Sequence, residues 1–421
     1  MIARVLIISN NSFSNVYNNG KTLEALFSAF PKDNLAQLYF HEGSLPDFTY
    51  CNKYWKISEM NLIKSFFKRR ESIGNEIKKQ SSLELTITVN KYPHILHIIK
   101  NQTGNLFRDI LWTVCRWESP ALIRWIKNYN PHVIFFVGSS ASFSSKIALR
   151  ISSLLEVPLA VYYTDDYLFS LPQNNFLQRC AFKRVETLYK KVIDASTAQF
   201  AIGSLMSQEY SRHFKKDFIP IMNAVPIMPY KEYQNNHIIN MVYFGGLHLN
   251  RWRMISRLAT LLPNNCNLIV YSAADTIDAN IKKVFDKTGV QFKGALSGDV
   301  LRLAMIWADI LLHVESDDNY NRRFTRLAVS TKIPEYLITG RPILGFGPGE
   351  VASMRILSDN GVGIVISSDS DDETVRELLY DFVNNYKKRA EIGLNGYNFA
   401  KKEFDIHVNS HRLMNLLSSI V

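Results

Sequence analysis

The sequence predicts an α/β protein made of two doubly wound domains that face each other. Three observations support this prediction. Short, continuous apolar runs alternate with helical patterns, as they do where parallel strands are covered by helices on both faces. The alternation is interrupted once, by a proline-containing stretch, and then starts again. A length of 421 residues is also what two domains of ordinary size require.

The first series of strands and helices predicts a domain over residues 1–212. Because each expected strand is apolar along its whole length, both faces of the sheet should be buried. These strands are Arg4–Ser9, Leu35–His41, Val133–Gly138, Leu159–Thr164 and Gln199–Gly203. The helical patterns between them include Gly20–Phe30, Leu106–Asn128 and Phe143–Leu155.

Residues 213–238 are expected to form a linker, since they contain three prolines and a polar run. A second series then predicts a domain over residues 239–402, with strands at 239–246, 267–272, 310–315, 342–346 and 363–366. A helix at about 403–421 is apolar on one face, which suits packing back onto the first domain. Ligands of doubly wound sheets bind at the carboxyl ends of the strands, so we expect a site in the cleft between the domains.

The composition is that of a globular protein from a reducing compartment. Four cysteines lie far apart and match no metal-finger spacing, so we expect reduced thiols. No apolar run approaches the roughly 20 residues that cross a bilayer, and the first residues are typical of a buried strand rather than a signal peptide. These features predict a cytoplasmic protein.

Positive charge is concentrated in the first half of the chain. Residues 1–205 hold 24 Lys and Arg against 15 Asp and Glu, whereas residues 206–421 hold 25 against 23. Within the first half, the segment 61–71 (NLIKSFFKRRE) would place apolar residues on one helix face bordered by basic ones. This pattern favours an anionic membrane surface as a partner, although an ordinary core helix or a nucleic-acid surface fits it too.

The stretch STKIPEYLITGRPILGFGP combines groups that a nucleoside diphosphate would need. Ser330 and Thr331 are expected to cap a helix whose first backbone N–H groups would face an anion. Lys332 adds a positive charge for a diphosphate, and the Glu335 carboxylate could accept hydrogen bonds from both hydroxyls of a ribose. Gly340 is expected to end the helix. An ordinary capped surface helix fits these residues about as well.

Two other strand ends of the second domain carry candidate donor-binding groups. In YFGGLHLNRW (243–252), Gly245 and Gly246 follow a strand and allow a ligand to approach the backbone closely. Arg251 begins the next helix, where its charge would suit a departing diphosphate. Glu315 ends another strand and is a further candidate, with a solvated acidic loop as the alternative.

The first domain carries polar candidates at two strand ends. A polar loop after the first strand contains Asn15, Asn19 and Gly20, which we assign to acceptor binding because the loop lacks the upstream glycine of a P-loop. Asp165 and Asp166 end a later strand, where adjacent carboxylates suit acceptor binding or base catalysis. A metal site is the weakest of these possibilities, and a capped turn with a surface acid remains the other interpretation.

Taken together, these motifs resemble those of the retaining, GT-B-fold glycosyltransferases of family 4, and most closely the bacterial members that build cell-surface polysaccharides. The likeness covers nearly the whole chain and is strongest from GGLHLNRW through HVES to STKIPEYLITGRPILGFGP. It implies two facing Rossmann-like domains. It also implies that Glu335 binds the ribose, that Arg251 contacts the leaving diphosphate, and that Ser330, Thr331 and Lys332 lie by the phosphates.

The resemblance implies an enzyme that transfers a sugar from a UDP- or GDP-linked donor to a hydroxyl of a glycan acceptor. The expected pathway is capsule, O-antigen or exopolysaccharide synthesis, in which the acceptor would be lipid-linked. A lipid-linked acceptor would explain the basic first half of the chain, which would lie at the inner face of the plasma membrane. Lys332 and Arg251 would act as catalytic groups by stabilising the charge of the departing diphosphate. Neither a metal ion nor a cofactor is therefore expected.

Two other functions fit the same sequence. A nucleotide-sugar epimerase would share the architecture but would process its substrate without an acceptor. A non-catalytic protein that binds nucleotide sugars or nucleic acid would need no transfer chemistry. Nucleic-acid binding further requires basic residues interleaved with aromatic ones along a groove, and we expect no nucleic-acid partner.

Overall fold

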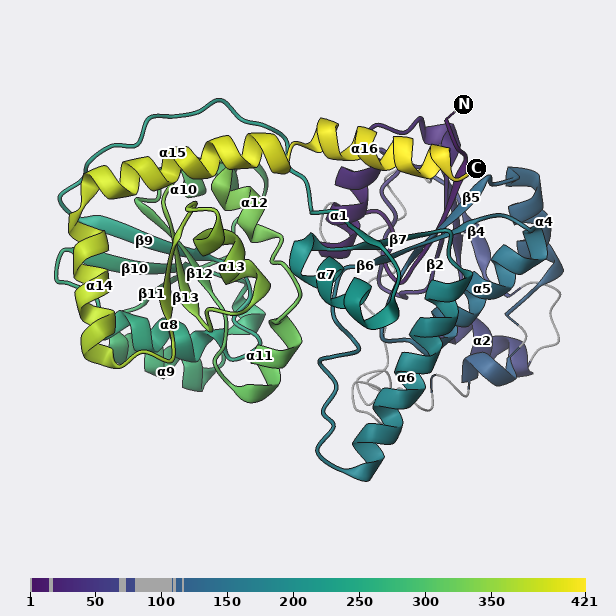
Figure 1. Ribbon diagram of the computed structural model, residues 1–421, viewed down its shortest axis with the longest axis horizontal. Helices are drawn as coiled ribbons and strands as arrows, with labels where there is room; N and C mark the ends of the chain where they lie inside the picture. Colours follow the sequence, from purple (N-terminus) through teal and green to yellow (C-terminus); the bar gives the residue numbers. More distant parts are fainter. Residues whose placement is uncertain (1, 15–17, 68–72, 80–107, 109–110, 116) are drawn as a thin grey trace. The chain divides into compact units, whose positions relative to one another are not determined.

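The computed structural model describes residues 2–14, 18–67, 73–79, 108, 111–115 and 117–421, and it divides into two units. Unit 1 comprises Met1–Met222 with His407–Val421, and unit 2 comprises Asn223–Ile406. Each unit holds one β-sheet with helices packed on it (Figure 1). The predicted fold class, α/β with two doubly wound domains, is confirmed.

The sheet of unit 1 has eight strands in the order β4-β3-β2-β1-β5-β6-β7-β8. Neighbouring strands are parallel, except that β3 and β4 are antiparallel. The strands are β1 Val5–Ser9, β2 Leu35–Tyr39, β3 Lys53–Lys56, β4 Asn75–Ile77, β5 Val133–Val137, β6 Leu159–Tyr163, β7 Ala198–Ala201 and β8 Phe218–Pro220. Because β1 lies between β2 and β5, the strand order reverses there, and a ligand site is favoured at the carboxyl ends of β1 and β5.

Helices of unit 1 connect these strands and cover the sheet. They are α1 Asn18–Phe27, α2 Glu59–Phe67, α4 Pro120–Tyr129, α5 Ser142–Leu155, α6 Phe176–Ala195 and α7 Gly203–Phe214, with a short 3-10 turn at Lys32–Asn34. The amphipathic segment expected at 61–71 begins in α2, but residues 68–72 and the side chains of its basic residues lie outside what the structure describes. The apolar and basic pattern of that segment therefore stays a prediction.

Helix α16 (Ile406–Ser419) completes the core of unit 1, although it comes last in the sequence. Leu413 and Leu417 are fully buried in the same apolar cluster as side chains of β1, β2, β5 and α1. The Ser410 hydroxyl donates to the Leu26 carbonyl and accepts from the Ala29 amide, both at 2.8 Å. The helix is thus held to α1 by hydrogen bonds as well as by apolar packing.

The sheet of unit 2 has six parallel strands in the order β11-β10-β9-β12-β13-β14. The strands are β9 Ile239–Phe244, β10 Cys266–Tyr271, β11 Gln291–Lys293, β12 Ile310–Val314, β13 Ile343–Gly347 and β14 Ile364–Ser367. Here the order reverses between β9 and β12. The carboxyl ends of these two strands are therefore where a doubly wound sheet would bind a ligand.

The helices of unit 2 are α8 Arg251–Ala259, α9 Ala279–Thr288, α10 Gly298–Trp307, α11 Asn319–Thr325, α12 Lys332–Leu337, α13 Ala352–Asp359, α14 Asp372–Asn384 and α15 Tyr386–Glu403, with a 3-10 turn at Ala274–Thr276. Apolar side chains of α8, α9 and α14 share one buried cluster with the strands. In the part of the chain that the structure describes, no helix is both long and apolar enough to cross a membrane.

The stretch 213–238, expected to be a linker, is ordered by contacts on both sides. β8 pairs with β7 in unit 1, whereas the residues after it pack on unit 2. There, Arg389 is buried and donates to the Tyr233 hydroxyl at 2.8 Å. Arg341 donates to the Lys231 carbonyl, and Tyr386 stacks on Tyr233. Buried arginines thus fix this segment to unit 2.

The packing of α16 generates a stability prediction. Leu413→Ala removes a fully buried side chain and leaves a cavity, so we expect the free energy of unfolding to fall by about 2–5 kcal/mol. Val408→Ala, on the exposed side of the same helix, is the control and should change it by less than about 0.5 kcal/mol. Denaturant unfolding monitored by circular dichroism measures both, and equal losses would contradict the packing described here.

Candidate functional site

A glycine at the carboxyl end of β9 lets Lys332 approach the backbone. The Lys332 ammonium donates to the Tyr243 hydroxyl at 3.2 Å and lies 4.6 Å from the centre of the Tyr243 ring. The same hydroxyl donates to the Gly246 carbonyl at 2.8 Å. Gly245 has a φ of +135°, and a Cβ at this position would overlap the Lys332 ammonium. Only glycine therefore suits this position, both for its backbone conformation and for the close approach.

Lys332 has no counter-ion in the described part of the chain. The ammonium contacts Tyr243 by a hydrogen bond and over the ring, and no carboxylate there pairs with it. A half-buried ammonium without a paired anion attracts negative charge from solution. The ammonium lies at the carboxyl end of β9, next to the switch point where the strand order reverses between β9 and β12. A doubly wound sheet binds its ligands at such a point.

A buried ion pair joins the first residue of α8 to the residue that follows β12. Arg251 donates from Nη2 to the Glu315 carboxylate at 2.9 Å and from Nε to the Val314 carbonyl at 3.1 Å. Only 3% of the Glu315 side chain and 11% of the Arg251 side chain is exposed. The guanidinium is therefore held in one orientation by the end of β12.

The charges of this pair are set by their surroundings. Burial by itself would raise the pKa of Glu315, but the Arg251 guanidinium and His313 lower it to about 2. His313 Nε2 lies 3.3 Å from the Glu315 carboxylate. Burial lowers the pKa of His313, so a neutral imidazole stands beside an ionised carboxylate.

His248 adds a titratable group to the glycine turn. Its Nε2 lies 3.4 Å from Arg251 Nη1, and a Cβ on Gly246 would overlap its ring. Partial burial, followed by the charges of Arg251 and Lys332, lowers the pKa of His248. An anion bound between these groups would favour the protonated imidazole.

The other residues expected in the donor site lie at the start of α12. Ser330 accepts a long hydrogen bond from the Lys332 amide at 3.4 Å, and its own amide donates to the Ser353 hydroxyl at 3.0 Å. Thr331 occupies the N-cap position but makes no cap hydrogen bond with its side chain, contrary to expectation. Glu335 lies in the first turn and is half-buried.

Helix α12 is shorter than the sequence predicts. It ends at Leu337, and Gly340, expected to end it, lies three residues further on. The chain between them tightens into three-residue turns, with hydrogen bonds from Thr339 to Tyr336 and from Gly340 to Leu337. Gly340 has a φ of +71°, so it ends this turn in the left-handed conformation rather than the helix itself.

The two aspartates at the end of β6 have different surroundings. Asp166 is fully buried and accepts hydrogen bonds from the Leu168 and Phe169 amides and from the Tyr210 hydroxyl. It therefore holds the turn after the strand. Asp165 is only half-buried, and burial raises its pKa although the Thr164 and Tyr167 hydroxyls donate to it.

A cavity of about 80 Å³ lies at the carboxyl ends of β1 and β5, the switch point of unit 1. Polar groups dominate its lining, and Tyr167 connects it to Asp165 through a hydrogen bond of 3.2 Å. The lining includes Ser9, Asn10, Asn11, Arg108, Ser139 and Tyr167. Hydroxyl and amide groups of this kind suit a hydroxyl-rich ligand.

Of the three expected acceptor residues, only Gly20 can be placed, and it is not among the residues that line this cavity. Asn15 lies outside the described residues, and the Asn19 side chain is not described. Gly20 is buried in α1, and a Cβ there would overlap Ser14. Glycine is thus needed at position 20 for packing, whereas the neighbouring cavity is built from other residues of the same sheet end.

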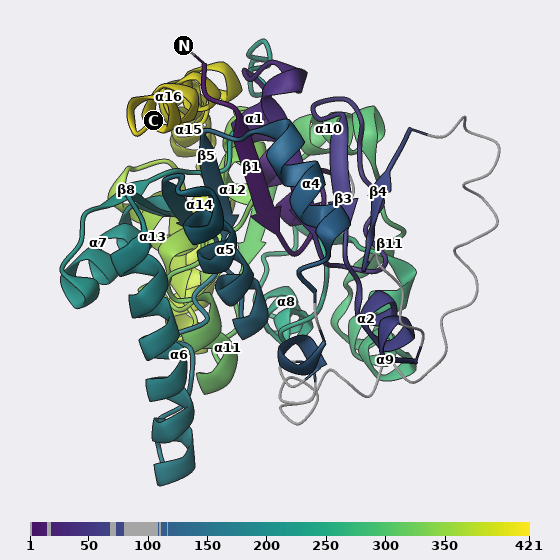
Figure 2. The same ribbon diagram turned by 90° about the vertical axis from the view of Figure 1, so that its right-hand side faces the viewer.

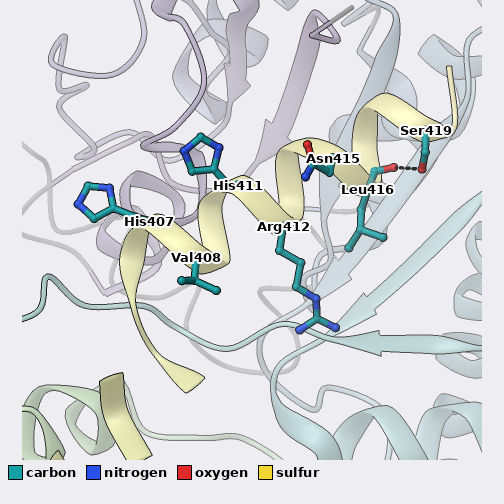
Figure 3. Close-up of a pocket in the computed structure, with 7 residues that line it drawn as sticks. All are labelled: His407, Val408, His411, Arg412, Asn415, Leu416 and Ser419. Atoms are coloured by element: carbon teal, nitrogen blue, oxygen red, sulfur yellow. Dashed lines mark hydrogen bonds between the residues drawn. The ribbon is translucent and has the colours of Figure 1, made fainter. Parts of the chain in front are cut away.

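A second hollow lies along the outward side of α16. Figure 3 shows His407 and His411 on one side of this helix, one turn apart, and Val408 and Arg412 on the other. All the side chains that line it come from α16. We assign it no chemistry, because a ligand there would rest on one helix rather than between elements.

Metal-binding geometry is not found among the residues that the structure describes: no three His, Cys, Asp or Glu side chains converge there. The charges that gather at the end of β9 are instead those of Lys332 and Arg251.

Comparisons with known proteins identify the fold. No protein-family model matches the chain, and no curated protein matches it by sequence. Solved structures do match. WaaG, described as a glycosyltransferase involved in lipopolysaccharide biosynthesis, is 14% identical, with a TM-score of 0.58 over 98% of this chain and 99% of its own.

Two further structures agree with this match. Anabaena Alr3699/HepE, solved in complex with UDP and glucose, is 12% identical, with a TM-score of 0.62 over 99% of this chain and 100% of its own. Sucrose-phosphate synthase from Thermosynechococcus elongatus is 10% identical, with a TM-score of 0.64 over 99% of this chain and 98% of its own. The chain therefore has the GT-B fold of these glycosyltransferases.

Two side chains of the site, Tyr243 and His248, were not predicted from the sequence, and His313 near the end of a buried strand was expected to be an ordinary core imidazole. Tyr243 lies inside an apolar strand, and His248 lies in a loop that was noted only for its glycines. The sequence did offer a signal for His248. It follows the glycine pair and lies three residues before Arg251, so its side chain can reach the first turn of the same helix. Tyr243 gains its role from a contact with Lys332, which is distant in the sequence, whereas His313 contacts Glu315, two residues away.

The buried pair predicts a pH-dependent stability. Glu315→Gln leaves the Arg251 guanidinium buried without a counter-charge, so we expect the free energy of unfolding at pH 7 to fall by roughly 3 kcal/mol. The pKa of Glu315 is lower in the folded than in the unfolded chain. The difference in free energy of unfolding between the wild type and Glu315→Gln is therefore fully present above pH 4.5, and it is lost as the pH falls toward about 2.

Urea unfolding at a series of pH values measures this difference. Asp317→Asn, an exposed acid two residues away, is the control and should change stability little at any pH. A Glu315→Gln protein as stable as the wild type at pH 7 would show that the ion pair is not needed to hold the end of β12.

Proposed function

We propose that the chain is a retaining glycosyltransferase that moves a sugar from a nucleoside diphosphate sugar to a hydroxyl of a glycan acceptor. One observation carries the proposal: the Lys332 ammonium, without a counter-ion in the described chain, lies over Gly245 at the switch point of unit 2. Arg251 adds a second, oriented cation at the same strand ends. The GT-B fold of the matching structures supports the same class of activity.

Lys332 and Arg251 would bind the diphosphate and stabilise its departure. When the bond between sugar and phosphate breaks, negative charge develops on the leaving diphosphate. Cations already held in place stabilise that charge without reorganising. Arg251 is held by Val314 and Glu315, and Lys332 by the Tyr243 hydroxyl. These groups would supply the charge for which other transferases use a metal ion, so we propose that neither a metal nor a cofactor is required.

The carboxylates of the site would have different roles. Glu335, half-buried on α12, would accept hydrogen bonds from the ribose hydroxyls. Glu315 would act through Arg251, because its carboxylate is buried and already bound by the guanidinium. In unit 1, Asp165 would bind the acceptor hydroxyl beside the polar cavity, and Asp166 would keep the turn in place.

The fold neighbours and the charge distribution favour one pathway and one location. WaaG is described as acting in lipopolysaccharide biosynthesis, and HepE was solved with UDP and glucose. The basic first half of this chain would suit a lipid-linked acceptor at the inner face of the plasma membrane. We therefore propose synthesis of a bacterial cell-surface polysaccharide from a UDP- or GDP-linked sugar.

A thermal-shift screen with UDP, GDP, TDP and their sugars tests the proposal. A ligand that binds only the folded state raises the melting temperature, by an amount that follows its concentration relative to Kd. One nucleotide should stabilise the protein more than the others. No shift with any of them would contradict the proposed function, and conversion of the sugar without an acceptor would indicate an epimerase instead.

Glu335 is predicted to contribute to nucleotide affinity. Glu335→Ala should weaken binding of the stabilising nucleotide by about 10-fold or more, because hydrogen bonds to a charged group are lost. Glu391→Ala, an exposed acid on α15 of the same unit, is the charge-matched control and should bind normally. Isothermal titration calorimetry measures both affinities, and equal values for the two variants would remove Glu335 from the site.

Lys332 is predicted to act mainly on turnover. Lys332→Ala should lower kcat at saturating donor by about 100-fold, because the developing charge loses its cation. Tyr243→Phe keeps the ammonium and the aromatic ring but removes the hydroxyl, so it should lose less than about 10-fold. Steady-state kinetics with the donor found in the screen measures both. A Tyr243→Phe loss as large as that of Lys332→Ala would show that the hydroxyl, rather than the charge, is what matters.

A further inference from the structure

The first turns of α6 project from unit 1. In both views of the ribbon the N-terminal end of this helix extends away from the sheet (Figures 1 and 2). The helix begins at Phe176, and its first buried side chain is Phe182. Asn175 caps the helix by accepting from the Gln178 amide at 2.9 Å. As far as the described residues show, a local cap rather than burial against other elements supports this end.

Two large apolar side chains lie at the projecting end. Phe176 is 71% exposed and Leu177 is 78% exposed. Single exposed apolar residues are normal on protein surfaces, and most need no explanation. Here the two are consecutive, lie at the tip of a projecting helix, and are followed by the exposed Cys180 and Ala181. The tip thus presents several apolar side chains to solvent.

Basic side chains follow directly behind this apolar tip. Residues 176–191 contain five Lys or Arg and one acidic residue, Glu186, which lies 2.8 Å from His213. Arg179 and Lys183 are exposed, lie one turn apart and make no ion pair in the described chain. Like charges at this spacing repel each other weakly, and an anionic partner would relieve that repulsion.

We propose that the N-terminal turns of α6 insert into an anionic lipid surface. Phe176 and Leu177 would enter the boundary between headgroups and acyl chains, while Arg179 and Lys183 would meet the lipid phosphates. An apolar tip bordered by cations is what interfacial binding requires, since burial and electrostatic attraction add. The proposal shares the anionic membrane with the proposed function and names the part of the chain that contacts it.

Charge complementarity favours lipid over a second copy of the chain. The protein carries a net charge of +11, and pairing two α6 tips would bring their cations together. Anionic headgroups would instead neutralise these cations. Self-association through α6 is therefore an outcome that the experiment must be able to detect.

Vesicle flotation of the full chain tests the proposal. Wild-type protein should bind vesicles that contain phosphatidylglycerol, and bind phosphatidylcholine vesicles much less. The double variant Phe176→Ser and Leu177→Ser should weaken binding by about 10-fold or more, because two apolar side chains no longer enter the bilayer. The matched control is Trp307→Ser, which removes a side chain that is 75% exposed on α10 of unit 2. This control should bind as the wild type does.

A charge variant separates the two contributions. Arg179→Glu with Lys183→Glu should weaken binding to phosphatidylglycerol vesicles about 10-fold and reduce its dependence on salt. Binding that is equal in wild type and both α6 variants would overturn the proposal. Light scattering that shows a dimeric wild type and a monomeric serine variant would also overturn the proposal, because α6 would then bind a second copy of the chain.

This measurement needs neither a donor nor an acceptor. Failure of the α6 variants to change vesicle binding would therefore leave the transferase proposal intact. Conversely, a chain that binds no nucleotide could still bind lipid through α6. The nucleotide found in the screen should raise the melting temperature of the serine variant by as much as it raises that of the wild type. This result would confirm that the variant is folded.

Discussion

The buried pair between Arg251 and Glu315 is the interaction on which the site of unit 2 depends. It joins the start of α8 to the end of β12, next to the point where the order of the sheet reverses between β9 and β12. An ionised carboxylate is costly to bury unless a cation and hydrogen bonds compensate it, and here Arg251 supplies the cation and a hydrogen bond while His313 lies beside it. The pair therefore fixes the direction of Arg251 before any ligand arrives. Lys332, over the neighbouring glycine, completes a positive site whose geometry is already in place.

Most of the fold could be predicted from the sequence, because continuous apolar runs signal parallel strands buried on both faces. The strands β3, β4, β8 and β11 were missed because each has only three or four residues and all but β8 include charged or polar ones, so they form no continuous apolar run. In the site, Lys332 and Arg251 were found through their positions next to a helix start and a glycine turn. The contact between Lys332 and Tyr243 could not be predicted, because the two residues are 89 positions apart in sequence.

The aspartates of unit 1 show how local sequence misleads about roles. Asp165 and Asp166 are adjacent and chemically identical, yet one holds a turn and the other stands beside a polar cavity. What separates them is their surroundings in the turn after β6, which ends at Tyr163. Asp166 accepts from two amides of that turn and from Tyr210, whereas Asp165 accepts only from the hydroxyls of Thr164 and Tyr167 among its described contacts. The acceptor loop gave a similar difficulty, since the glycine at position 20 is explained by its packing against Ser14.

The position of α16 has a consequence for how the chain matures. Leu413 and Leu417 belong to the core of unit 1, but they are synthesised after every residue of unit 2. Unit 1 therefore cannot complete its core until the last residues of the chain are available, and its apolar surface stays uncovered until then. Surface of this kind is exposed to aggregation and to chaperones. Docking of α16 is thus expected to be a late step in the folding of unit 1.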